Sequence, residues 1–279
     1  MSKTNDNLTR RKLRIKLIIF LTLAGLLVVF GLLAHRLAPN DPNATNSFVM
    51  NAPPSAQFPF GTDRYGRCIC SRVFFGARTS IFSAVALVAI TFVFGSFLGM
   101  LAGWFGGAVD TLVMRFVDML LALPQMVLAI AVAGILGGGM ANAMLAMGIT
   151  GWTLYARLAR AQVLAMKEEP FVCAARLSGC STFSILFKTL LPNMLGVLTV
   201  TAATQIGTMM IGIAGLSFLG IGVSEPHAEW GSMINNSRAY MQLAPWAVLA
   251  PALATIITVM VFNYLGDCIR DWLDVEVEK

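Results

Sequence analysis

Charged residues are scarce in this sequence. Lys, Arg, Asp and Glu make up 12% of the 279 residues, whereas hydrophobic residues make up 57%, and the mean hydropathy is +0.74. A soluble globular chain usually carries about a quarter charged residues. The composition therefore excludes an ordinary soluble protein and indicates a polytopic membrane protein.

The sequence also lacks the motifs of several catalytic classes. It has no Gly-x-x-x-x-Gly-Lys-Ser/Thr loop for ATP phosphates and no His-Glu-x-x-His metal motif. Its only histidines are His35 and His227, so the serines of the apolar segments lack a plausible histidine partner. We therefore predict that the chain is not an enzyme and takes its energy from a partner.

Near-uncharged stretches of about twenty residues recur along the chain, and this length crosses a bilayer. The first is expected to be a retained helix, because Ala34-His35-Arg36 is a poor signal-peptide cleavage site. The pattern predicts an all-α fold with six transmembrane helices, near 17–35, 81–103, 113–136, 142–160, 194–221 and 246–266. Around the first helix, the chain is predicted to divide into four further segments. These are a basic cytosolic N-terminal tail (1–16), an extracytoplasmic loop with an interfacial helix (36–80), a five-helix permease core (81–266) that includes an inner loop (163–193), and a cytosolic C-terminal tail (267–279).

The distribution of Lys and Arg predicts that both termini lie in the cytosol. Residues 61–80 of the outer loop are locally basic and run against this rule, but the first helix carries more weight. Basic residues crowd the segment just before that helix, at Arg10, Arg11, Lys12, Arg14 and Lys16. The formal net charge of +6 thus reports orientation in a lipid membrane and predicts no nucleic-acid partner.

Three of the five cysteines fall in predicted cytosolic segments, where thiols stay reduced. Cys68 and Cys70 face outward and form a Cys-x-Cys pair without a nearby histidine. Such a pair is compatible with metal ligation or with small side chains that fill an interfacial helix. No metal site is firmly assigned.

The predicted inner loop contains a short helix of about two turns. Pro170 suits the first helical position, where a missing N–H costs nothing, and Gly179 suits a helix end that needs a left-handed residue. Ala174 and Ala175 leave one face nearly bare, so another protein can approach the backbone closely. We therefore predict a docking loop.

This loop resembles the "EAA" loop of ABC importer permeases. The matching residues are Ala174-Ala175, Gly179 and Leu191-Pro192, whereas Cys173 stands where the motif usually has Glu. The resemblance implies a coupling helix for an ATPase subunit, with the contact made by Cys173, Ala174, Ala175, Arg176, Gly179, Leu191 and Pro192. The alternative is an ordinary amphipathic connector.

Three further blocks resemble the dipeptide, oligopeptide and nickel branch of these permeases. They are Gly61-Thr62-Asp63 through Arg78-x-Ser80, Gly106-Gly107 through Pro124, and Gly215-Leu216-Ser217 through Met233. The usual Asp after Gly66-Arg67 is Cys68 here, and Arg67, Arg72 and Arg78 are expected to contact lipid headgroups or to pair with Asp63. The form Ala228-Glu229-Trp230-Gly231 is closer to nickel permeases than to peptide permeases.

A glycine recurs every fourth residue in the second predicted span, at Gly95, Gly99 and Gly103. Such a stripe predicts close packing against another helix in lipid. In the third span, Pro124 removes a backbone hydrogen bond, so we expect a kink there.

Arg115 and Asp118 precede that proline and are three residues apart. This spacing places opposite charges on one helix face. We expect an ion pair near the cytosolic interface, in a structural or a gating role.

The fifth predicted span carries polar residues on one face. Thr201, Thr204, Gln205 and Thr208 fall at i, i+3, i+4 and i+7. Polar side chains within a membrane face the bundle interior or a wet cavity, so we expect these residues, with Met209, to line the solute path. The alternatives are that the polar groups only hold helices together and that Met209 is a packing residue.

His227 lies in a predicted outer segment, close to Glu229. This pair is compatible with a transient cation contact at the outer mouth, or with a solvated loop. In the fifth span, Thr208 and Gly212 stand at positions where a nickel permease can carry His.

The resemblance covers roughly residues 60–275 and implies a type I ABC importer permease of the inner membrane. Its implied partners are a second related permease subunit, two ATPase subunits that bind ATP and Mg, and an external solute-binding protein. No cofactor is expected in this chain.

Nickel ion or a nickel chelate is favoured over di- or oligopeptides as the solute. A secondary transporter driven by an ion gradient is disfavoured, because the spans hold almost no ionisable residue, and a scaffolding subunit is a third hypothesis.

Overall fold

The computed structural model describes residues 3–277, with side chains from residue 11 to residue 273. This described part is built from helices and contains no β-strand. The elements are α1 (Lys3–Leu32), α2 (Ala34–Leu37), η1 (Ser47–Val49), α3 (Ile69–Phe105), α4 (Gly107–Leu121), α5 (Gln125–Leu136), α6 (Met140–Met166), α7 (Pro170–Leu177), α8 (Thr182–Ser184), η2 (Ile185–Leu190), α9 (Leu191–Phe218), α10 (Trp230–Ser237), η3 (Arg238–Tyr240) and α11 (Trp246–Val277).

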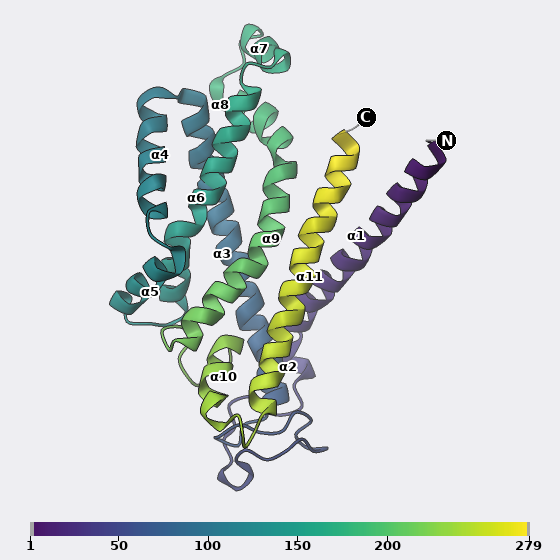
Figure 1. The fold of residues 1–279 in the computed structure, drawn as a ribbon, viewed down its shortest axis with the longest axis vertical. Coiled ribbons are helices and arrows are strands. Elements are labelled where there is room, and N and C mark those ends of the chain that lie inside the picture. The colour runs from purple at the N-terminus through teal and green to yellow at the C-terminus, as the bar shows by residue number, and fades with distance from the viewer. Residues whose placement is uncertain (1–2, 278–279) are drawn as a thin grey trace.

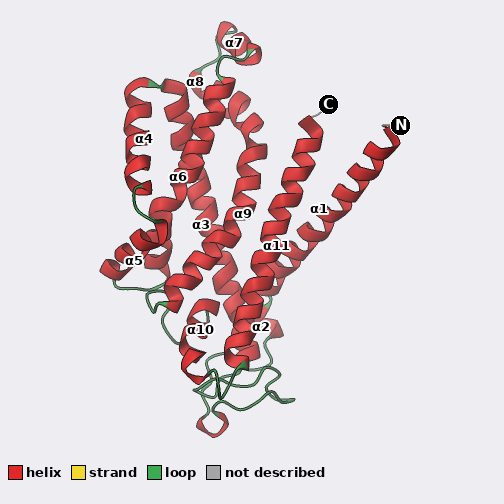
Figure 2. Ribbon diagram, in the orientation of Figure 1, coloured by secondary structure: helices red, strands yellow, loops and turns green. Residues whose placement is uncertain are grey.

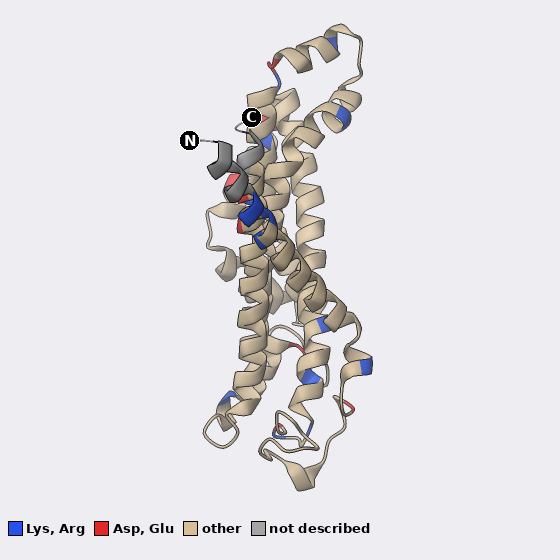
Figure 3. Ribbon diagram, turned by 90° about the vertical axis from the view of Figure 1, so that its right-hand side faces the viewer, with Lys and Arg blue, Asp and Glu red and all other residues tan. Residues whose placement is uncertain are grey.

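The long helices run side by side, and α3 packs against both α6 and α9 (Figure 1). α1 and α11 lie on one side of this group, and α4 and α5 lie on the other. α7 is at one end of the molecule, whereas α10 and the loop 38–68 are at the opposite end, where most of the loop structure gathers (Figure 2). Charged positions lie mostly toward the two ends, and the middle of the bundle is largely free of them (Figure 3).

Four helices are long and apolar enough to cross a membrane: Arg11–Leu32, Ile69–Phe105, Thr182–Phe218 and Trp246–Leu273. α4 and α5 pass the same test together and add a fifth crossing if they form one broken span. The fourth predicted span lies in α6, which is not among these helices. The count of six spans and the cytosolic placement of both termini stay predictions.

The second span begins earlier than predicted. α3 starts at Ile69, so residues 69–80 are its first turns and not a separate interfacial helix. The preceding loop is hydrogen-bonded to polar residues in these first turns. Arg72 donates to the carbonyl of Pro42, and Ser71 accepts from the backbone N–H of Asn40.

The sequence predicts a kink in the third span, but the structure shows a break. α4 ends at Leu121, α5 begins at Gln125, and the two helices meet at 86°. Pro124 precedes α5 with an extended ψ of 128°. A proline has no N–H for the α ladder and also keeps the residue before it out of helical conformation. We call residues 121–125 the elbow.

α3 and α6 meet along the glycine stripe. A Cβ at Gly95 would lie 2.2 Å from the carbonyl oxygen of Trp152, and one at Gly99 would lie 2.2 Å from that of Ala156. Gly103 extends this approach by one turn. The spacing therefore marks a backbone contact that no larger residue permits.

A continuous helical run from Thr182 to Phe218 joins α8, η2 and α9. Within it, η2 forms a π turn directly before Pro192. Pro192 has no N–H for the carbonyl of residue 188, so the α ladder is interrupted there. Residues 178–181, which are not helical, link α7 to this run.

Candidate functional site

α7 has both end signals that the sequence predicts. Pro170 is in its first turn, and Gly179 lies just past its end with φ 76°. The backbone N–H of Cys180 donates to the carbonyl of Ala175 at 3.1 Å, a bond that the left-handed glycine makes possible. A side chain at Gly179 would meet open space but would strain the backbone.

One side of α7 is open to solvent and the other is anchored. Leu177 is 90% exposed and Ala174 is also exposed, whereas Val172 is buried in a cluster beneath the helix. Cys173 is half-buried, and its Sγ lies 3.7 Å from the carbonyl oxygen of Glu168. The open side therefore presents small and apolar groups on a fixed helix.

Arg176 ties α7 to the end of α3. Its guanidinium lies 4.5 Å from the centre of the Trp104 ring, and it also donates to the carbonyl of Lys167 at 3.2 Å. Leu191 packs against the same buried cluster as Val172, and Pro192 is exposed at the start of α9. Most residues predicted for the loop thus lie at one end of the molecule (Figure 1).

The predicted polar face of α9 lies on a side that this chain leaves partly open. Thr208 is exposed, and Thr201, Thr204 and Gln205 are half-buried. The hydroxyls of Thr201 and Thr204 donate to carbonyls of the preceding turn of α9. The face therefore offers hydroxyl oxygens and an amide without any charge.

Met209 does not belong to this face. It is 1% exposed, and a Cβ at Gly151 of α6 would lie 2.8 Å from its methyl carbon. One residue along a helix turns the side chain by about 100°, which carries Met209 from the open side into the core. The structure therefore corrects its predicted place in the path and supports the packing interpretation.

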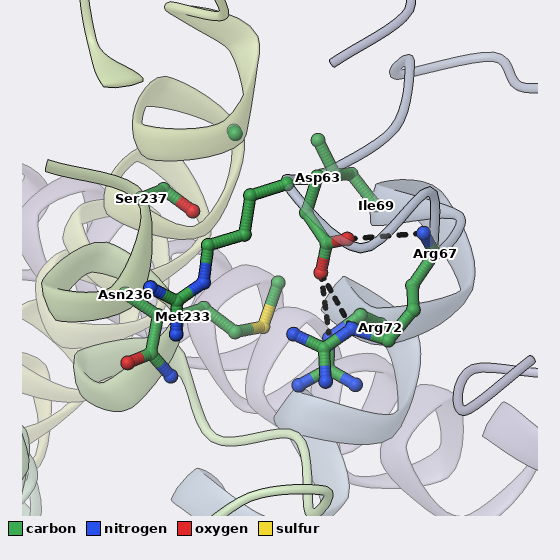
Figure 4. A pocket seen from close by; sticks show the side chains of 9 residues that line it. Asp63, Arg67, Ile69, Arg72, Met233, Asn236 and Ser237 are labelled. Carbon is green, nitrogen blue, oxygen red and sulfur yellow. Dashed lines mark hydrogen bonds and ion pairs between the residues drawn. The ribbon is translucent and has the colours of Figure 1, made fainter. Parts of the chain in front are cut away.

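A buried ion network closes the end of the molecule opposite α7. Arg67 Nε lies 2.7 Å from Asp63 Oδ2, and Arg67 Nη2 lies 3.2 Å from Glu225 Oε1. Arg72 Nε lies 3.9 Å from the same Asp63 oxygen. Figure 4 shows Asp63 facing both arginines, with α10 across a cavity of about 10 Å³. Arg67 is thus paired with Asp63 and Glu225. Arg72 also contacts Asp63, but it donates hydrogen bonds to the carbonyls of Pro42 and Pro226.

The sequence interpretation missed Glu225, which joins this network from a loop far along the chain. Its partner Arg67 is 4% exposed, whereas the Glu225 side chain is 32% exposed, so the pair lies at the edge of the buried network. No local spacing links residues 158 positions apart. The only sequence signal for this pairing is that residues 61–80 hold more arginines than acidic residues, so a carboxylate from elsewhere in the chain is needed to pair with them.

Glu229 is a helix cap and not the outer-mouth cation contact that was predicted. It is 1% exposed and accepts hydrogen bonds from the backbone N–H groups of Gly231 and Ser232, each at 2.8 Å. Burial raises the pKa of this carboxyl, and the hydrogen bonds that it accepts, including one from Ser80, oppose the rise. His227 is exposed, so the two side chains occupy different surroundings.

Two ion pairs join α4 to α6. Asp118 lies 2.6 Å from Arg157, and Asp110 pairs with Arg160. The predicted pair of Asp118 with Arg115 on the same helix is therefore wrong, because an arginine of the neighbouring helix reaches the carboxylate. Arg157 and Arg160 are one helical turn apart, a signal that two acids lie opposite them.

Cys68 and Cys70 are buried as free thiols at the start of α3. Among the side chains that the structure describes, those of residues 11–273, no group of three or more His, Cys, Asp or Glu is placed to hold a metal ion. Of the two interpretations of this pair, the filling of a helix end is the one that agrees with its burial.

Comparison with known families decides the class of protein. Residues 95–279 match the model of the family described as "Binding-protein-dependent transport system inner membrane component". The chain belongs to this family. It is an ABC importer permease of the inner membrane.

Several curated relatives match the permease along nearly its whole length. It is 37% identical to the dipeptide transport system permease of Alkalihalophilus pseudofirmus over 272 residues, which cover 98% of this chain and 88% of the relative. It is 38% identical to the nickel transport system permease of Escherichia coli K12 over 266 residues, or 95% of each chain. It is 43% identical to the glutathione transport system permease of Escherichia coli O6:K15:H31 over 256 residues, or 91% of this chain and 84% of the relative.

These relatives are permease subunits and not catalysts, and ATP hydrolysis belongs to partner ATPases. A solved structure of the inward-facing MetNI methionine ABC transporter contains a chain that resembles the permease with a TM-score of 0.50 and 17% identity. The likeness covers 70% of this chain and 94% of that chain. It shows a shared fold, that of type I importer permeases.

Proposed function

We propose that the permease forms one half of the solute path of an ATP-driven importer for a nickel chelate or a short peptide. Its proposed partners are a second homologous permease subunit, two ATPase subunits that bind ATP and Mg, and an external solute-binding protein. The observation that carries this proposal is the helical run from Thr182 to Phe218, which leads from the α7 loop to the polar face of α9.

The open side of α7 is proposed to dock on an ATPase subunit. Exposed Ala174 and Leu177 offer a close-approach surface, and Arg176 on Trp104 fixes α7 to α3. A push on α7 then reaches both α3 and α9. Because Cys173 turns its thiol toward its own loop, we propose that backbone shape around Gly179 makes the contact without the usual Glu.

The neutral face of α9 is proposed to contact the solute. Hydroxyl and amide groups exchange hydrogen bonds with a hydrated solute without holding it by charge. Thr208 and Gly212 stand where imidazoles would be needed for direct nickel ligation. We therefore propose that nickel, the solute favoured from the sequence, passes as a chelate. A short peptide is the second candidate, supported by the dipeptide and glutathione permeases among the relatives.

Membership of the family removes the ion-gradient transporter as an alternative, because the relatives are ABC permeases. The remaining test is reconstitution of the permease with its partners in proteoliposomes. We expect uptake of radioactive nickel–histidine or of labelled dialanine to require ATP and all partner subunits. Uptake by the permease alone, or uptake that continues without ATPases, would overturn the proposal.

A further inference from the structure

The ion network at the end opposite α7 borders a small cavity of about 10 Å³. A cavity needs about this volume to hold one water-sized group. Its walls come from the loop before α3, from the first turns of α3, and from α10 with the start of α11. Figure 4 shows the side chains of the network on one side of the cavity and those of α10 on the other. A group held in the cavity would therefore bridge these parts of the chain.

The polar wall of this cavity is mainly basic. Arg64, Arg67 and Arg72 line it, and Asn236 of α10 adds an amide. Asp63 also lines it, but its carboxylate faces Arg67 and Arg72 (Figure 4). Guanidinium groups present only hydrogen-bond donors, and an amide presents donors as well as an acceptor. The wall is therefore suited to a group that accepts hydrogen bonds.

The charges around the cavity do not cancel. In the described part of the chain, the three arginines form ion pairs with Asp63 and Glu225 and with no other acid. Three guanidinium groups against two carboxylates leave one positive charge, because arginine stays protonated in proteins. Glu229 does not line the cavity, and its carboxylate is held by the first N–H groups of α10.

Arg72 contributes most of the uncompensated charge. It is 2% exposed, yet the carboxylate oxygen of Asp63 lies 3.9 Å from its Nε and is shared with Arg67. Its hydrogen bonds to the carbonyls of Pro42 and Pro226 satisfy donors without supplying a negative charge. A buried charge without a close counter-charge is strongly unfavourable. The cavity beside Arg72 is therefore a place where an anion would stabilise the fold.

Arg64 brings an unsatisfied donor to the same cavity. Its Nε is buried and has no hydrogen-bond acceptor among the described residues. Its Nη2 lies 3.7 Å from Glu225 Oε1, which is beyond hydrogen-bond range. Both of these side chains are 32% exposed, so this edge of the site is open to water. A small ion can thus enter beside Arg64 and provide the acceptor that its Nε lacks.

From the charge, the donors and the size of the cavity we infer that it binds one small monovalent anion, chloride. One negative charge balances the excess of one positive charge. Chloride is close to water in size and accepts hydrogen bonds from any direction, whereas phosphate, sulfate and the carboxylate of an organic solute are too large for this volume. The bound ion joins the loop before α3 to α10. The inference does not rest on the proposed function.

Thermal unfolding of the full-length permease in detergent tests the site. Melting temperatures are measured while sodium gluconate is replaced by sodium chloride at constant ionic strength, because gluconate is too large for the cavity. Chloride at about ten times its Kd should raise Tm by about 3 °C or more, and the rise should saturate. Equal melting temperatures in the two salts would overturn the inference and leave water as the occupant.

Arg64→Gln separates the site from a general effect of the salt. The substitution removes the excess charge and the unsatisfied Nε from a partly exposed position. Arg36→Gln is the matched control, because Arg36 is exposed at the same end of the molecule and does not line the cavity. The chloride shift should be lost in Arg64→Gln and kept in Arg36→Gln. A shift that persists in Arg64→Gln, or that is lost equally in both, would contradict the assignment.

Bromide gives a direct measurement on the wild-type chain, which decides the question even where Arg64→Gln fails to fold. Crystals of the permease soaked in sodium bromide should show an anomalous difference peak in the cavity, beside Arg64 and Arg72. Bromide peaks on the surface alone would identify an adventitious ion only, and the inference would be wrong.

Discussion

Arg176 of α7 stacks on Trp104 of α3, with the guanidinium 4.5 Å from the ring centre. This contact joins the exposed loop to the helix that packs against both α6 and α9. A cation on an aromatic ring contributes about 0.5–1 kcal/mol at an exposed site, which adds to the burial of Val172 in holding α7 in place. α7 therefore has two connections to the bundle, the contact with Trp104 and, after residues 178–181, the helical run that continues into α9.

Replacement of Gly179 by Val should uncouple ATP hydrolysis from uptake. Gly179 has φ 76°, a conformation that a β-branched residue adopts only with strain. The measurement is ATPase activity and solute uptake in the same proteoliposomes, with uptake lost and hydrolysis retained. The control is Gly25→Val on α1, where nothing lies within 4 Å and φ is not positive. Normal coupling in Gly179→Val would mean that α7 is only a connector.

Replacement of Thr208 by Leu should reduce uptake several-fold and leave assembly of the transporter intact. The change removes an exposed hydroxyl from the proposed path and adds no buried clash, because Thr208 is exposed. Thr199→Leu is a matched control on the same helix. Thr199 is also exposed but lies nine residues away, half a turn round α9. Equal uptake by the two variants would favour a purely scaffolding role for this face.

Replacement of Gly99 by Ala should destabilise the permease by about 3 kcal/mol or more, because the contact is with rigid backbone. The added Cβ would lie 2.2 Å from the carbonyl oxygen of Ala156, so α3 and α6 must move apart. Gly25→Ala adds the same methyl group to α1 with nothing within 4 Å. Thermal unfolding in detergent should show a large loss for Gly99→Ala and no loss for Gly25→Ala. Equal melting temperatures would show that the two helices are not in backbone contact.

Replacement of Glu229 by Ala should lower stability by about 0.5–2 kcal/mol through the loss of a helix cap, and Glu229→Gln should cost less because it keeps an acceptor. Burial raises the pKa of Glu229, so the neutral carboxyl is favoured in the folded state. Its contribution to stability is therefore fully present below the ordinary Glu pKa and is lost as pH rises through the raised value.

Melting temperatures measured from about pH 4, just below the ordinary Glu pKa of about 4.3, up to about pH 8 check this prediction. The wild type should lose stability toward the upper end relative to Glu229→Gln, which cannot ionise. A parallel pH dependence in both proteins would show that Glu229 does not titrate in this range.

Local signals in the sequence predicted local structure well. Pro170 and Gly179 mark the two ends of α7 through backbone conformation alone, and the glycine repeat marks a helix contact because only small residues allow it. Thr201 and Thr208 share a face because helix geometry fixes their directions. The assignment of that face to the solute path stays a prediction.

Contacts between different helices were not predictable from the spacing of residues in the sequence. Asp118 has an arginine three residues away on its own helix, yet it pairs with Arg157 of α6, since helix packing decides which cation arrives. Pro124 is compatible with a kink or with a break, and the packing of α5 against α6 selects the break. Glu229 looked like a surface acid because glutamate is not a favoured cap residue.

The π turn at Ile185–Leu190 sets the direction, about the helix axis, in which the side chains of α9 point. A π turn holds an extra residue compared with an α turn, and one residue of α-helix corresponds to about 100° of rotation. Deleting a single residue from this segment would therefore swing the whole threonine face of α9 by roughly a quarter turn. The direction in which this helix presents its hydroxyls is thus decided near α7, far from the hydroxyls themselves.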